Sequence, residues 1–103
     1  MGDKSWKQFE RRAASFFGGK RNPLSGSMSG HTGGDVRHEK LYVECKQRKE
    51  HAVINLWDDA KTKADKENKT PVVCLSVKGR KGFWVMVHSN DLEKVAQCTG
   101  NKQ

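Results

Sequence analysis

The sequence predicts an α/β fold in which helices flank one mixed central β-sheet, within a single domain of residues 1–103. Residues 3–17 repeat apolar side chains at helical spacing, and residues 41–46 alternate apolar and polar side chains as a half-buried strand does. Two short apolar runs, residues 72–77 and 83–88, are typical of further strands. The predicted order is therefore helix, two or three strands, helix, two strands and a short final helix.

The first predicted helix contains a misplaced acid. Asp3 is its expected N-cap, and Gly18 with Gly19 ends it. Its apolar arc consists of Trp6, Phe9, Ala13, Phe16 and Phe17. Glu10 falls inside this arc, where a bare carboxylate is costly, so it must be paired, neutralised or bound to a cation. Two alternatives stay open: an ion pair with a lysine of the sheet, or a metal site that Glu10 completes above the sheet.

A glycine-rich segment, residues 18–34, follows the helix and contains six glycines. Its low apolar content predicts a flexible linker, or a mobile arm that brings Lys20, Arg21 and His31 to phosphates. Residues 27–31 could form an edge strand. The segment lacks the Gly-Lys-Ser/Thr ending of a nucleotide-binding loop.

The strand at residues 41–46 carries the predicted chemistry. Leu41, Val43 and Cys45 point to one side of it, and Tyr42, Glu44 and Lys46 point to the other. A partner strand at residues 35–39, joined by a turn near Glu39 and Lys40, would bring Asp35 beside Glu44. Two carboxylates that hold a hard divalent cation, with an amine that orients or deprotonates water, suit phosphodiester hydrolysis. A solvated strand face is the alternative.

The second half predicts a helix at residues 53–66, then strands 72–77 and 83–88 around a tight turn at residues 78–82. The helix stripe is Val53, Leu56, Trp57, Ala60 and Ala64, with Ile54 off the stripe. The run at residues 72–77 is expected to be covered on both faces. Ser89 or Asn90 is the expected cap of a short helix that carries Leu92, Val95 and Ala96.

The net charge of +8 and the pI near 9.6 indicate an anionic polymer as partner. The candidate phosphate contacts are Lys20, Arg21, His31, Arg48, Lys49, Lys78, Arg80 and Lys81. Cysteines 45, 74 and 98 have neither zinc-site nor CxxC spacing, which predicts reduced thiols. No signal peptide or membrane span is evident, so a cytoplasmic protein is expected.

A helix glutamate, then an aspartate, then Glu-X-Lys, in this order of elements, resembles the PD-(D/E)XK nuclease superfamily. Within it the chain is most similar to the small Holliday junction resolvases of archaea and phages. The resemblance implies a restriction-endonuclease-like core and a Mg²⁺ or Mn²⁺ cofactor. The implied metal ligands are Glu10, Asp35, Glu44 and the main-chain carbonyl of Cys45. It also implies Lys46 as the catalytic amine and Gln47 as a supporting residue. Gly34 stands where the family motif has proline.

The expected function is therefore that of an intracellular Mg²⁺- or Mn²⁺-dependent endodeoxyribonuclease, of cellular or phage origin, that prefers branched DNA. A four-way junction needs two symmetric cuts, which predicts a homodimer. Its apolar contact is expected from strand 83–88, from Ile54, or from Leu92 and Val95. Two alternatives are a related nuclease acting on another DNA structure, and a non-catalytic basic module that binds nucleic acid.

Overall fold

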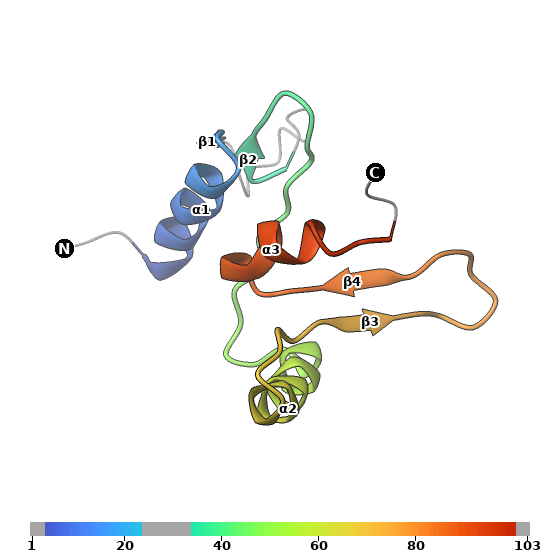
Figure 1. The fold of residues 1–103 in the computed structure, drawn as a ribbon. Helices are drawn as coiled ribbons and strands as arrows, with labels where there is room; N and C mark the ends of the chain where they lie inside the picture. The colour runs from blue at the N-terminus through green and yellow to red at the C-terminus, as the bar shows by residue number, and fades with distance from the viewer. Residues whose placement is uncertain (1–3, 24–33, 101–103) are drawn as a thin grey trace. The chain divides into compact units, whose positions relative to one another are not determined.

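The computed structural model describes residues 4–23 and 34–100 (Figure 1). Its elements are α1 (Ser5–Phe16), β1 (Lys20–Arg21), β2 (Val36–Arg37), α2 (Ala52–Lys66), β3 (Val73–Leu75), β4 (Trp84–Met86), η1 (Ser89–Asp91) and α3 (Leu92–Ala96). The α/β class is confirmed. Within the described residues, however, two separate two-stranded antiparallel sheets, β1–β2 and β3–β4, take the place of the single mixed central sheet.

The chain divides into two compact units, unit 1 (residues 1–49) and unit 2 (residues 50–103). The single nuclease domain stays a prediction. No helix in the described part of the chain is long and apolar enough to cross a membrane.

Helix α1 confirms the first predicted helix, although Lys4 is its N-cap and the expected cap, Asp3, lies outside the described residues. The helix ends as predicted, because Gly18 adopts a positive φ of 69°, a conformation that favours glycine. Glu10 and Ala14 are its buried residues, whereas Trp6 and Phe16 are exposed. The predicted apolar arc is therefore only partly covered.

Strand β1 lies at the start of the glycine-rich segment and corrects the prediction that this whole segment is a flexible linker or arm. It pairs antiparallel with β2, with Lys20 opposite Arg37 and Arg21 opposite Val36. Val36 is fully buried and forms the centre of this unit. The possible edge strand at residues 27–31 lies outside the described residues.

The predicted strand at residues 41–46 is reduced to one antiparallel bridge between Val43 and Val36, so the prediction of a continuous strand there is wrong. The turn that precedes it is present near the expected place. The main-chain NH groups of Lys40 and Leu41 donate to His38 Nδ1, at 2.9 and 3.1 Å, and these bonds turn the chain after β2. Because β2 ends at Arg37, only one residue of the motif finds a ladder partner.

The side-chain alternation of the motif is largely confirmed. Val43 and Cys45 are half-buried, while Tyr42, Glu44 and Lys46 are exposed. Leu41 is also exposed, so its predicted place on the covered side is wrong.

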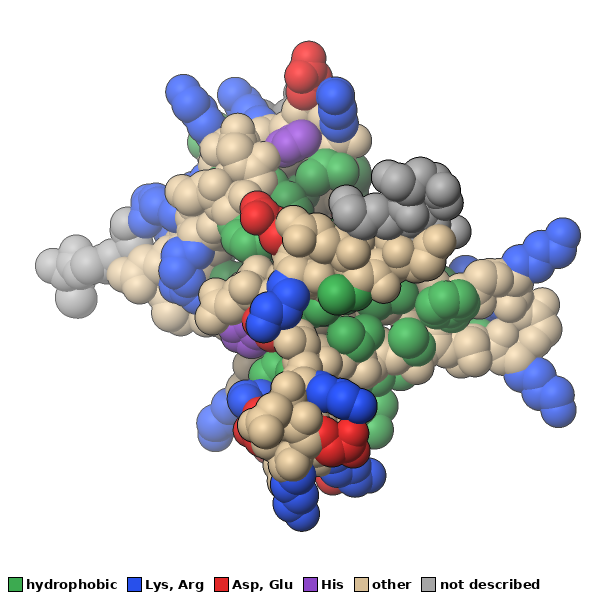
Figure 2. All heavy atoms as spheres, viewed as in Figure 1, with side chains coloured by type: hydrophobic (Ala, Val, Ile, Leu, Met, Phe, Trp, Pro, Cys, Tyr) green, Lys and Arg blue, Asp and Glu red, His purple; other side chains and the backbone are tan. Residues whose placement is uncertain are grey.

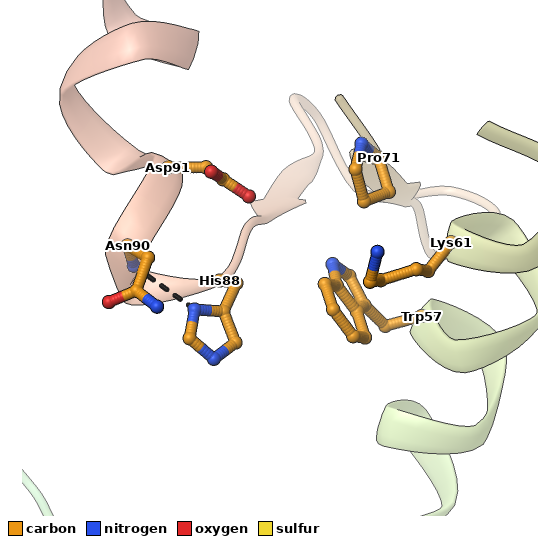
Figure 3. Close-up of a pocket in the computed structure, with 6 residues that line it drawn as sticks. All are labelled: Trp57, Lys61, Pro71, His88, Asn90 and Asp91. Atoms are coloured by element: carbon orange, nitrogen blue, oxygen red, sulfur yellow. Dashed lines mark hydrogen bonds between the residues drawn. The ribbon is translucent and has the colours of Figure 1, made fainter. Parts of the chain in front are cut away.

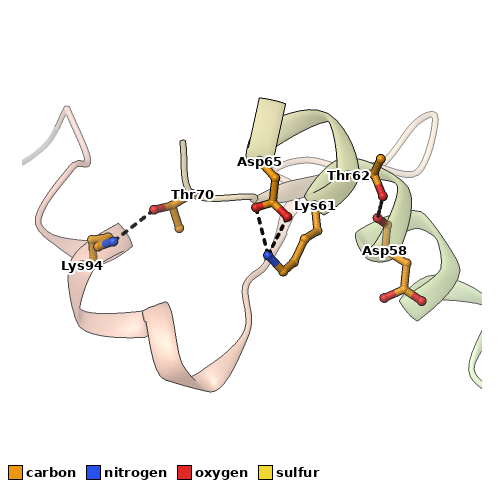
Figure 4. Close-up of polar contacts among 6 residues, drawn as sticks. All are labelled: Asp58, Lys61, Thr62, Asp65, Thr70 and Lys94. Atoms are coloured by element: carbon orange, nitrogen blue, oxygen red, sulfur yellow. Dashed lines mark hydrogen bonds and ion pairs between the residues drawn. The ribbon is translucent and has the colours of Figure 1, made fainter. Parts of the chain in front are cut away.

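In the second unit, α2 confirms the predicted helix, and Val53, Trp57, Ala60 and Ala64 of its stripe are half-buried. Leu56 is exposed, contrary to its predicted place in the stripe, and Ile54 is exposed as predicted. The solvent side of α2 carries local polar contacts, including an ion pair from Lys61 to Asp65 and a hydrogen bond from Thr62 to the Asp58 carbonyl (Figure 4). Exposed pairs of this kind stabilise a helix by only about 0.2–0.5 kcal/mol.

Strands β3 and β4 are shorter than predicted and pair antiparallel, with Leu75 opposite Trp84 and Cys74 opposite Val85. Val73, Leu75 and Met86 are half-buried, and α2 packs against β3. Cys74 and Val85 share the other face and are exposed. The prediction that residues 72–77 are covered on both faces is therefore wrong, because a two-stranded sheet with one packed helix covers only one face.

The final helical segment forms as expected but with a different cap. Asp91 is the N-cap of α3, and His88 caps the preceding η1 by accepting a hydrogen bond from the Asn90 main-chain NH at 3.0 Å, so neither Ser89 nor Asn90 is the cap. Lys94 of α3 donates to Thr70 Oγ1, which ties α3 to the segment before β3 (Figure 4). The three cysteines are free thiols, in agreement with the sequence.

Candidate active site

Asp35 is the most firmly held residue of the predicted site. Its main-chain NH donates to the Val43 carbonyl at 2.7 Å, and its carbonyl accepts from the Asn22 NH at 3.0 Å. Its side-chain Oδ2 accepts from the Cys45 NH at 2.6 Å. Asn22 is fully buried and also donates from Nδ2 to the Gly34 carbonyl. Asp35 is thus fixed on both main-chain sides and lies against the residue that follows Glu44.

Two glycines make this arrangement possible. Gly34 has a φ of +69°, and a Cβ atom there would lie 2.5 Å from the Val43 carbonyl oxygen. A Cβ atom at Gly19 would collide with the Arg37 carbonyl oxygen. Side chains at either position would push apart the segments that place Asp35.

Glu44 and Lys46 lie on the same exposed side, as the alternation predicts. Lys46 Nζ is 3.1 Å from Glu44 Oε2, and the two side chains are 60% and 47% exposed. An exposed pair of this kind contributes about 0–1 kcal/mol, so little energy opposes its rearrangement when a ligand arrives.

Glu10 is buried and faces the β1–β2 sheet, as the helical plot predicts. Its Oε1 accepts from Arg21 Nε at 2.7 Å, and the side chains of Glu10 and Arg21 are 7% and 18% exposed. The Arg21 guanidinium also lies 5.4 Å from the centre of the Trp6 ring, within cation–π range. The ion-pair alternative for Glu10 is therefore what the structure contains, with an arginine of β1 in place of the expected lysine.

The half-buried thiol of Cys45 is influenced by the charges of the predicted acids. Burial is the largest cause that raises the pKa of Cys45 above its ordinary value, and the charges of Asp35, Glu10 and Glu44 raise it further. Cys45 lies on the covered side of the motif, whereas the Glu44 side chain lies on the exposed side.

Carboxylate and carbonyl oxygens are the ligands that Mg²⁺ and Mn²⁺ prefer, so the donors fit such an ion in kind. Their placement does not yet fit it. Among the residues the structure describes, no three His, Cys, Asp or Glu side chains come together as a ligand group. Glu10 is engaged by Arg21, and Glu44 by Lys46.

Gln47, the predicted supporting residue, accepts a hydrogen bond from Ser5 Oγ at 3.2 Å. This contact ties the end of the motif to the first residue of α1. Sequence reasoning did not foresee it, because no periodicity relates residues 42 positions apart.

The predicted phosphate contacts differ in availability. Lys20, Arg48, Lys49, Lys78, Arg80 and Lys81 are exposed. Arg21 is half-buried and paired with Glu10, so it is less available, and His31 lies outside the described residues.

Sequence reasoning missed one candidate contact, Arg37, which is exposed and lies opposite Lys20 in the β1–β2 pair. Its alternation with buried Val36 is the signal that would have found it. Like charges placed opposite each other destabilise a sheet, and a bound anion would relieve this.

The second unit contains a cavity of about 190 Å³ (Figure 3). Its lining residues are Trp57, Lys61, Pro71, His88, Asn90 and Asp91. The Trp57 and His88 rings lie 5.6 Å apart, and the buried Trp57 indole nitrogen has no hydrogen-bond partner in the described chain. The cavity is smaller than the roughly 300–1,000 Å³ typical of small-molecule sites, and none of the predicted site residues lines it.

No protein-family model, no curated protein and no solved structure matches this chain.

Proposed function

We propose that the chain is a Mg²⁺- or Mn²⁺-dependent DNA endonuclease that hydrolyses phosphodiester bonds and prefers branched DNA of the Holliday junction type. The observation that carries the proposal is the placement of Asp35, whose Oδ2 accepts from the NH of Cys45 next to Glu44, together with Lys46, whose Nζ lies 3.1 Å from Glu44 Oε2. A basic chain that concentrates acids and an amine at one place fits the hydrolysis of an anionic polymer better than simple charge balance does.

Asp35 and Glu44, together with the Cys45 carbonyl, are the residues that would hold the cation. When bound, a divalent cation in such a site activates water and offsets charge on the phosphate. Lys46 is the amine that would orient the attacking water, and Gln47 would support the phosphate. Glu10 is the further ligand that the family resemblance implies, and it could serve only after Arg21 releases it.

The proposed partner is DNA, contacted by the exposed lysines and arginines, and the proposed assembly is a homodimer that cuts both sides of a branch. Exposed apolar side chains that could form the dimer contact include Ile54, Val85 and Leu92. An intracellular location, with the gene of cellular or phage origin, belongs to the same proposal.

A non-catalytic nucleic-acid-binding module is the second candidate. The observation that favours it is that Glu10 and Glu44 are each paired with a cation, as acids that only balance a basic surface would be.

Cleavage of a panel of substrates separates the candidates: a four-way junction, a flap, a linear duplex and a single strand, in Mg²⁺ and in EDTA. We expect Mg²⁺-dependent cuts, fastest in the junction, that Glu44→Gln and Lys46→Ala abolish. Glu39→Gln and Lys40→Ala remove the same charges nearby and serve as controls. Binding without cleavage of any substrate would reject the nuclease and support the module. Cleavage without preference for the junction would reject only the substrate.

A further inference from the structure

The connection between β3 and β4 ends in a basic, aromatic turn, which we call the hairpin tip: Lys78, Arg80, Lys81, Phe83 and Trp84. The Arg80 NH donates to the Val77 carbonyl at 2.9 Å, and Gly79 and Gly82 supply positive φ angles of 87° and 75°. Such a turn needs glycine at these two positions, which supports a defined shape for the tip.

The charge of this region has one sign. From Asn68 to Asn90 the sequence contains four basic residues, Lys69, Lys78, Arg80 and Lys81, and no acid. No carboxylate of the described chain pairs with the three cations of the hairpin tip, whereas Lys61, Lys63 and Lys69 each have an acidic partner. Basic side chains project from the end of the hairpin, and hydrophobic side chains gather behind them (Figure 2).

The aromatic residues of the hairpin tip are unusually exposed to solvent. Phe83 is 64% exposed and Trp84 is 47% exposed. The Arg80 guanidinium lies 4.8 Å from the centre of the Trp84 ring, which places a cation against an aromatic face. Aromatic faces next to cations that track a phosphate chain are the combination by which proteins bind single-stranded nucleic acid.

A second copy of this chain is a poorer occupant of the same surface. A two-fold contact through the hairpin tip would oppose Lys78, Arg80 and Lys81 to the same residues of the other copy, and the like charges would repel. Double-stranded DNA satisfies the charges but leaves the aromatic faces unused, because its bases are stacked on one another.

We propose that the hairpin tip binds unpaired bases of nucleic acid, with Phe83 and Trp84 stacking on the bases and the three cations contacting phosphates. This deepens the proposed function by naming unpaired segments as the substrate feature recognised. It requires no cleavage, so it can fail or succeed independently of the assignments of Asp35, Glu44 and Lys46.

The test is fluorescence anisotropy of the full chain with a labelled 20-nucleotide single strand and with the matching duplex, in EDTA so that nothing is cut. Stacking on one aromatic residue is worth about 1–3 kcal/mol per base, so Phe83→Leu and Trp84→Leu should each weaken single-strand binding by at least about fivefold. Duplex binding should change by less than about twofold. Trp84→Phe keeps an aromatic face and should restore most of the single-strand affinity.

Lys81→Gln is the matched charge variant and should weaken both nucleic acids similarly, while it lowers the salt slope by about one unit. Tyr42→Leu removes another exposed aromatic residue and should leave the preference for single strands unchanged. Equal losses for single strand and duplex in Phe83→Leu, or no loss in either, would overturn the proposal. A change in sedimentation coefficient with unchanged single-strand affinity would instead identify the tip as a contact between copies.

Discussion

Glu10 offers the sharpest test of whether the predicted metal ligands are ligands. Its carboxylate is 7% exposed and receives a 2.7 Å hydrogen bond from Arg21, so we expect it to act as the counter-ion of that arginine. Glu10→Gln keeps an acceptor for Arg21 but removes the charge. Because hydrogen bonds to charged groups contribute about 1.5–3 kcal/mol, unit 1 should lose about 2 kcal/mol of stability.

Substitution of the other partner, Arg21, should cost more stability. Arg21→Gln takes the arginine away from a buried carboxylate, and breaking buried pairs in this way costs about 3–5 kcal/mol. The 18% exposure of Arg21 places this case at the lower end, near 3 kcal/mol. The double variant Glu10→Gln with Arg21→Gln should cost less than the sum of the two, because it leaves no unpaired charge.

Two measurements decide between counter-ion and ligand. Hydrogen exchange of the α1 amides reports the stability of unit 1, and calorimetric titration with Mn²⁺ in the absence of DNA reports metal affinity. We expect Glu10→Gln to accelerate exchange while Mn²⁺ affinity changes by less than about threefold, and Glu44→Gln to do the opposite. If Glu10→Gln reduced Mn²⁺ affinity tenfold or more and left exchange unaltered, the counter-ion role would be refuted.

Four further results are expected. Alkylation of Cys45 at pH 8 should be slower than that of exposed Cys74, because a raised pKa leaves less reactive thiolate, and the rate should still climb above pH 9. Glu44→Gln removes one cause of the raised pKa and should speed this alkylation, as peptide mass spectrometry would show; an unchanged rate would contradict an effect of the Glu44 charge on the thiol. Asp35→Asn should abolish cleavage yet leave junction binding within about threefold, since phosphate contacts are untouched, and an anisotropy titration checks it. Six exposed cations among the predicted contacts imply a duplex salt slope of about −3 to −5, whereas a slope near −1 would reject them.

The helices could be read from the sequence because their signals are local. The spacing of apolar residues predicted α1 and α2, and the same spacing predicted the burial of Glu10. The partner of Glu10 could not be read, because it depends on which strand α1 covers. Strand β1 is only a Lys-Arg dipeptide beside two glycines, a composition that no strand propensity favours.

The strands were less predictable because pairing is not local. The alternation at residues 42–46 correctly predicted which side chains face solvent, yet only Val43 found a partner in the ladder. The register between strands decides how far such pairing extends. Here the pairing ends early because the chain turns at His38. The hydrogen bond from the Cys45 NH to Asp35 Oδ2 likewise depends on how residues ten positions apart come together, which no spacing reveals.

Gly34 has a consequence for how this chain tolerates sequence change. Its φ of +69° excludes proline, whose ring holds φ near −65°, and the Val43 carbonyl oxygen excludes every other side chain. A saturation library at codon 34, selected for the proposed DNA cleavage, should therefore return glycine alone, although no charged or reacting group is altered. Proline would be among the variants lost.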